Sequence, residues 1–182
     1  MGTSDVIFVV NSLIDHSLYL NKTLYITSYD YATCFDALWL EECLLSLRKL
    51  GVSSTTIHLL YELNKTAEIT VRTPFGNADP FTTENIVKQG TVWGSKLCCG
   101  STAEICDEDS VGGASVGDVT IHSTLYVDDC NRFSTDIIDN ELAHYNFVNF
   151  SSRKRAPLNA EKCVCLTVNK HAHINPPTFF LL

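Results

Sequence analysis

Residues 119–133 read Val-Thr-Ile-His-Ser-Thr-Leu-Tyr-Val-Asp-Asp-Cys-Asn-Arg-Phe, and this stretch decides how the chain folds. Its first part, Val119 to Val127, is rich in β-branched and aromatic residues, which are typical of a strand. Asp128 and Asp129 follow where a turn would reverse the chain, and Cys130 to Phe133 can return as the second strand. The stretch therefore predicts a β-hairpin with two adjacent carboxylates at its tip.

Two carboxylates at such a tip can point outward from one edge of a sheet, where hard cations such as Mg²⁺ find oxygen ligands. One hairpin cannot complete a metal site, so a third acid is needed. Asp30 is the natural candidate, because it follows the strand predicted for Leu24 to Tyr29 and a neighbouring strand could bring it alongside. Ordinary turn chemistry remains the alternative interpretation of the Asp128-Asp129 pair.

The rest of the sequence mixes helical and strand patterns, which predicts an α+β fold. Apolar residues at helical spacing, with Ser or Asp caps, predict helices over 5–20, 37–50 (capped by Asp36), from 53 or 54 to 64, 95–106, and 134–149 (capped by Ser134). Strands are expected at 24–29, within a long-looped hairpin over 68–87, and at 163–168, and residues 107–117 form a surface loop. No repeat or linker divides the chain, so we expect a single domain over 1–182 with a loose tail at 176–182.

Composition narrows the class of function. The net charge of −8, from 13 basic and 21 acidic residues, argues against strong nonspecific nucleic-acid binding by the whole surface. No two of the eight cysteines stand in the Cys-x-x-Cys spacing that is typical of zinc ligands. We therefore expect reduced, mostly buried thiols rather than a zinc site. No apolar stretch is long enough to cross a membrane, and we expect an intracellular protein, in the cytoplasm or nucleus, with no membrane partner.

Three segments are informative because of their order along the chain. They are Asp30-Tyr-Ala-Thr-Cys-Phe35-Asp36, Gln89-Gly90-Thr-Val-Trp-Gly94 and Tyr126-Val-Asp-Asp129. Together they resemble the palm motifs of reverse transcriptases, and the first looks most like those of non-LTR retrotransposons. The resemblance covers residues 5–170 and implies a right-hand polymerase palm, an antiparallel sheet backed by helices, without most of the fingers and thumb.

The resemblance also implies roles for individual residues. Asp30, Asp128 and Asp129 would be the catalytic acids and the ligands of two Mg²⁺ ions, with Mn²⁺ as an alternative metal. The residues implied to contact the nucleotide are Tyr31 (whose carbonyl could be a further metal ligand), Phe35 (under the incoming sugar), Gln89 and Gly90 (along nucleotide and template) and Lys162 (toward phosphate). Two alternatives stay open at this point: Phe35 as a core aromatic, and the basic run 153–155 as the phosphate contact.

The implied reaction is template-directed nucleotidyl transfer, with an RNA or DNA template, a primer and deoxynucleoside triphosphates as partners. Because fingers and thumb are missing, or come from a partner chain, we expect weak or no activity from this chain alone. The first alternative is a non-enzymatic polymerase-like domain that acts in protein interaction, as a decayed or domesticated retroelement fragment. The others are an unrelated α+β domain that matches by accident and a cysteine hydrolase, for which no cysteine has a nucleophile context.

Overall fold

The computed structural model describes residues 2–32, 35, 38–84, 87–88, 90–108 and 110–169. These form two compact units: unit 1 takes the residues before 33 and after 101, and unit 2 takes 33–101. Several predicted features lie outside the described residues: Asp36 as a helix cap, a helix start at Ala37, Gln89, and the loose tail at 176–182. The expectation of a single domain over 1–182 stays a prediction.

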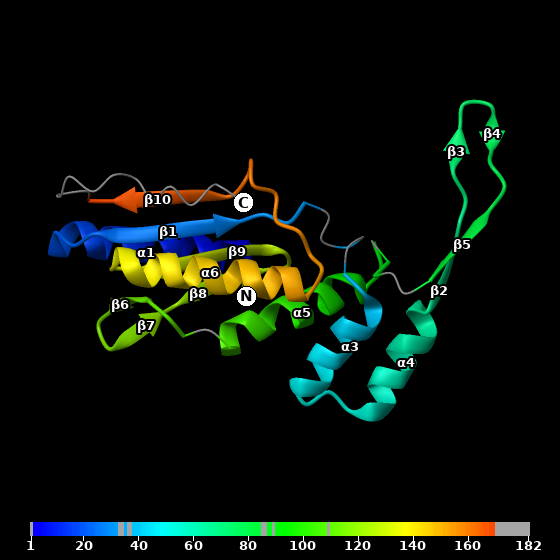
Figure 1. Cartoon of the computed structure of the whole chain (residues 1–182), viewed down its shortest axis with the longest axis horizontal. Helices are drawn as coiled ribbons and strands as arrows, with labels where there is room; N and C mark the ends of the chain where they lie inside the picture. Colours follow the sequence, from blue (N-terminus) through cyan, green and yellow to red (C-terminus); the bar gives the residue numbers. More distant parts are fainter. Residues whose placement is uncertain are drawn as a thin grey trace. The chain divides into compact units, whose positions relative to one another are not determined.

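Unit 1 is built on a four-stranded antiparallel sheet in the order β10, β1, β9, β8 (Figure 1). In this order the strands span Val164–Val168, Leu24–Tyr29, Asp129–Ser134 and Ser123–Tyr126. β1 lies inside the sheet, so that Ile26 pairs with Leu166 on one side and Phe133 on the other. A small hairpin, β6 (Ala114–Val116) with β7 (Val119–Ile121), precedes β8.

One helix covers each face of this sheet, because side chains alternate along a strand. Helix α1 (Thr3–Leu20) packs Leu13 into an apolar cluster with Leu24, Ile26 and Phe133. Helix α6 (Ile137–Arg153) takes the other face, where the Phe147 ring stacks on Tyr29 with 3.9 Å between ring centroids. The α+β class and the antiparallel sheet backed by helices are thus confirmed.

The sequence prediction was wrong about where α6 begins. Ser134 stays in β9, paired with Tyr25, and Asp136 is the cap instead. The Asp136 carboxylate accepts the backbone N–H groups of Ile138 and Asp139 at 2.8 and 3.3 Å. An aspartate satisfies these otherwise unpaired donors as well as a serine does, so the motif alone could not choose between the two positions.

Unit 2 contains helices α3 (Leu40–Lys49) and α4 (Ser54–Asn64), then a β-ribbon. Ser53 caps α4, as predicted, by accepting the backbone N–H of Thr56. The ribbon pairs β2 (Thr66–Ile69) with β5 (Phe81–Glu84), and β3 (Arg72–Thr73) with β4 (Gly76–Asn77) beyond them, which confirms the expected long-looped hairpin. Helix α5 (Gly94–Glu108) follows, and the boundary between the units falls within it.

Two further expectations can be compared with the structure. The seven cysteines among the described residues are not joined in disulfides, and most are buried, as the sequence predicted. The loop expected over 107–117 was wrong at its start, where Asp107 and Glu108 continue α5, and for Ala114–Val116, which form β6. In the part of the chain that the structure describes, no helix is both long and apolar enough to cross a membrane.

Candidate active site

The turn between β8 and β9 has an unusual backbone. Tyr126 pairs with Asp129, which leaves Val127 and Asp128 as the two turn residues. Val127 has φ of +59°, and Asp128 does not share this positive φ, a combination that hairpins normally reserve for glycine at the first turn position. The Val127 carbonyl accepts a hydrogen bond from the Thr102 hydroxyl of α5 at 3.2 Å. A β-branched residue in this conformation is strained, and such strain concentrates at functional sites.

Strand pairing brings Asp30 to this turn. Tyr29, the last residue of β1, pairs with Cys130, so the register continued by one residue places Asp30 opposite Asp129. The rings of Tyr29 and Tyr31 both pack near Phe147 of α6, with centroid distances of 3.9 and 6.2 Å. Because neighbouring side chains alternate, Asp30 between the two tyrosines is directed away from α6. The structure thus gathers the ends of two strands around acids that lie 99 positions apart in sequence.

Asp30 and Asp128 interact electrostatically with Asp129. The pKa of the Asp129 carboxyl is raised above its ordinary value, chiefly by partial burial and further by the negative charges of Asp128 and Asp30. Like charges raise a carboxyl pKa only when they are near and poorly screened. The interpretation of Asp128-Asp129 as ordinary turn residues does not account for a third acid in this field.

Asp30 has an oxygen that fits a metal ligand. Its Oδ2 atom is buried and accepts no hydrogen bond from the residues that the structure describes, although a third of the side chain is exposed. A buried carboxylate oxygen without a donor is costly unless a cation compensates it. A cation lies beside it: the Nζ atom of the Lys162 ammonium is 3.6 Å from this oxygen. Among the residues that the structure describes, no three His, Cys, Asp or Glu side chains lie close enough together to hold one ion.

The segment Pro157–Cys163, which contains the predicted site residue Lys162, is hydrogen-bonded along Asp30–Ala32, a contact that the sequence did not predict. The Asn159 N–H donates to the Asp30 carbonyl at 2.8 Å, and the Ala32 N–H donates to the Pro157 carbonyl at 2.9 Å. The Cys163 thiol also contacts the Asp30 carbonyl at 3.8 Å, and burial raises the pKa of that thiol. These bonds fix the backbone that directly follows the Asp30 side chain.

The residues expected to contact the nucleotide are divided between the two units. Tyr31 and Lys162 lie in unit 1 beside Asp30, where Tyr31 is buried and forms an isolated bridge with Leu158. Phe35 and Gly90 belong to unit 2. Phe35 is half-buried, and Gly90 is exposed with φ of +73°, a backbone conformation that favours glycine.

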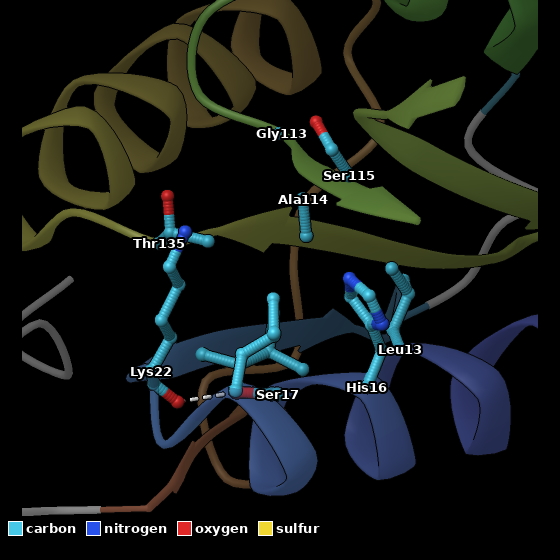
Figure 2. Close-up of a pocket in the computed structure, with 10 residues that line it drawn as sticks. Leu13, His16, Ser17, Lys22, Gly113, Ala114, Ser115 and Thr135 are labelled. Atoms are coloured by element: carbon cyan, nitrogen blue, oxygen red, sulfur yellow. Dashed lines mark hydrogen bonds between the residues drawn. The ribbon is translucent and has the colours of Figure 1, made fainter. Parts of the chain in front are cut away.

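Unit 1 also contains a cavity of about 150 Å³ between α1 and β6. Ala114 and Leu13 line it, His16 lies beside Leu13, and the Lys22 side chain extends toward Thr135 (Figure 2). The cavity includes Leu24, the first residue of β1, whereas Asp30 follows the last residue of that strand. It therefore lies at the other end of β1, and none of the predicted site residues that the structure describes lines it.

Comparison with protein families gives one match that covers nearly the whole chain. Residues 4–176 match the model of the family described as reverse transcriptase (RNA-dependent DNA polymerase). No curated protein matches the chain in sequence.

Solved telomerase structures share the fold. One is the apo telomerase of Candida tropicalis, with a TM-score of 0.70, 14% identity, and coverage of 94% of this chain and 33% of that one. Another is Candida albicans telomerase in complex with a fragment of telomeric RNA, with a TM-score of 0.68, 16% identity, and coverage of 91% and 31%. At these identities the likeness shows the fold alone, and this chain spans about a third of the length of either telomerase.

Proposed function

This chain belongs to the reverse transcriptase (RNA-dependent DNA polymerase) family, and we propose that it carries the nucleotidyl-transfer site of a retroelement polymerase of the non-LTR type. The observation that carries the proposal is the position of Asp30 opposite Asp129, with Asp128 in the adjoining turn. These acids stand in the order and at the strand ends that the family resemblance implies. Their mutual effect on the Asp129 pKa supports one shared site.

In this proposal the three carboxylates hold two Mg²⁺ ions, or Mn²⁺ in their place. When bound, such ions activate the primer 3′-hydroxyl and stabilise the leaving pyrophosphate. The unsatisfied Oδ2 of Asp30 supports its role as a ligand. Three carboxylates repel one another without a cation. We therefore expect their side chains to approach one another only when metal is bound.

Other residues would position the substrates. We propose that the Tyr31 carbonyl adds a ligand, that Phe35 lies under the incoming sugar, and that Gln89 and Gly90 lie along nucleotide and template. The fold shared with a telomerase solved in complex with telomeric RNA supports a nucleic-acid template. Because the net charge of the chain is −8, we propose that fingers, thumb or a partner chain supplies most of the basic surface that grips it.

Primer extension tests this proposal. The purified chain is given an RNA template with an annealed DNA primer, deoxynucleoside triphosphates, and Mg²⁺ or Mn²⁺. We expect slow incorporation that falls at least about 100-fold in Asp128→Asn, because each carboxylate supplies electrostatic stabilisation that water cannot replace. Asp118→Asn is the matched control, since Asp118 is an exposed turn residue of the β6–β7 hairpin in the same unit, and it should leave the rate unchanged.

Two results would contradict the proposal. Equal incorporation by the wild type and Asp128→Asn would assign the activity to a contaminant or to another site. No incorporation with either metal, together with no binding of Mn²⁺ by the wild type, would favour the alternative of a polymerase-like domain that acts in protein interaction.

A further inference from the structure

We propose that the Lys162 ammonium serves as the cation of the carboxylate site while no metal is bound, and that metal must displace it from Asp30. This inference rests on the proposed function. It goes beyond a phosphate-contacting role, because it assigns Lys162 a partner and a task before any nucleotide arrives. Metal binding and release of Lys162 then become one coupled event.

The first support is the choice of oxygen. Lys162 Nζ lies 3.6 Å from Oδ2 of Asp30, the same atom that is buried and accepts no hydrogen bond. At 3.6 Å the contact is an ion pair without a formed hydrogen bond, so the ammonium compensates the charge while leaving the lone pairs of the oxygen unused. A divalent ion that binds the same oxygen at roughly 2.1 Å would satisfy it more fully.

The second support is the anchoring of the lysine backbone. Lys162 and Cys163 both donate their N–H groups to the Asn159 carbonyl at 3.0 Å, and Asn159 itself donates to the Asp30 carbonyl. The turn that carries Lys162 is thus fixed to the residue that its side chain pairs with. Such anchoring keeps the ammonium near Asp30 without the full entropic cost of ordering a free surface lysine.

The third support is the exposure of the two partners. Two thirds of the Lys162 side chain is exposed, against one third of Asp30. When a divalent ion arrives, its charge repels the ammonium, which can swing into water while the carboxylate stays in place. A displaced ammonium close to the metals is then free to meet a negatively charged group of the substrate.

Competition for one oxygen makes a measurable prediction. Mn²⁺ is titrated into the full chain without nucleotide or primer, and free Mn²⁺ is followed by electron paramagnetic resonance. Lys162→Met keeps most of the apolar stem and removes the charge, and we expect it to bind Mn²⁺ about 3- to 10-fold more tightly than the wild type, the range for a partly exposed pair. Lys162→Arg, which keeps a cation, should remain within about twofold of the wild type.

Lys65→Met is the matched control. Lys65 is likewise exposed, but it belongs to unit 2, where it forms an ion pair with Glu62 at 2.6 Å. We expect it to leave Mn²⁺ affinity unchanged, which separates loss of a specific competitor from loss of one positive charge. Circular dichroism melts of each variant verify that it is folded.

The outcomes separate the two claims. If the wild type binds Mn²⁺ and Asp30→Asn does not, but Lys162→Met binds no more tightly than the wild type, the metal site stands and the competition is overturned. If Lys65→Met tightens binding as much as Lys162→Met, the effect is general electrostatics and the inference also fails. If neither the wild type nor Lys162→Met binds Mn²⁺, the proposed function and this inference fall together.

Discussion

Two β-hairpins of this chain follow opposite rules. The turn between β8 and β9 places Val127 at a positive φ, against its intrinsic preference, and the Thr102 hydroxyl holds its carbonyl. The turn between β3 and β4 consists of Pro74 and Phe75, and the positive φ of +122° falls on Gly76, the glycine that begins β4, as local turn chemistry favours. The comparison indicates that the conformational preferences of the turn residues determine the β3–β4 turn. In the β8–β9 turn, which carries Asp128 of the candidate site, tertiary contacts override those preferences.

The largest expected difference between the two regions concerns their aromatic residues. Phe147 is fully buried against Tyr29, whereas Phe75 at the tip of the ribbon is fully exposed. We expect Phe147→Ala to lower the free energy of unfolding by about 3–5 kcal/mol, because it leaves a cavity under the strand that leads to Asp30. Phe75→Ala should change it by less than about 0.5 kcal/mol. Urea denaturation followed by circular dichroism measures both, and similar losses would contradict the comparison.

Substitutions at the two turns should change the free energy of unfolding in opposite directions. Val127→Gly should raise the free energy of unfolding by about 1 kcal/mol, because relief of backbone strain exceeds the entropic cost of glycine. Gly76→Ala should destabilise the ribbon by about 1 kcal/mol, since the positive φ disfavours alanine although no atom lies within 4 Å of an added Cβ. Hydrogen exchange of the amides in each hairpin reports both changes. A loss of stability in Val127→Gly would show that this turn is unstrained.

The smallest expected effect depends on pH. The pKa of Asp129 is raised in the folded chain, so its ionisation opposes folding: the unfolded chain loses its proton first, near pH 3.9. Asp129→Asn should therefore be more stable than the wild type at pH 7, and the difference should shrink as the pH falls toward 4. Thermal melts at several pH values measure it, with Asp118→Asn as the control. A difference independent of pH would exclude the ionisation of Asp129 as its cause.

Much of the fold could be predicted from local patterns. Apolar spacing identified α3 and α4, and the strand character of Leu24–Tyr29 identified β1. The predicted start of α6 was wrong because Ser134 and Asp136 are both good helix caps. The pairing of Ser134 in β9 decides between them. Local preference is a poor guide when a sheet competes for the same residue.

The position of Asp30 at a strand end beside the Asp128-Asp129 pair could be predicted from the sequence, whereas the contacts around these acids could not. Strand ends pointed to Asp30 and to the Asp128-Asp129 pair, and the register places Asp30 opposite Asp129. No local signal could show that Asn159 bonds to Asp30 or that Thr102 holds the turn, because these contacts join distant segments. In the sequence, the feature that could have indicated backbone strain is Val127, a β-branched residue between a strand and two acids.

Paramagnetic broadening by Mn²⁺ tests the central claim most directly. In the nuclear magnetic resonance spectrum of the full chain, substoichiometric Mn²⁺ should first broaden the amide signals of Asp30, Asp128 and Asp129, and this selectivity should vanish in Asp30→Asn. Leu24, six residues earlier on the strand and so about 20 Å away, should remain sharp. Broadening centred elsewhere, or the same in Asp30→Asn, would contradict a metal site made by these three acids.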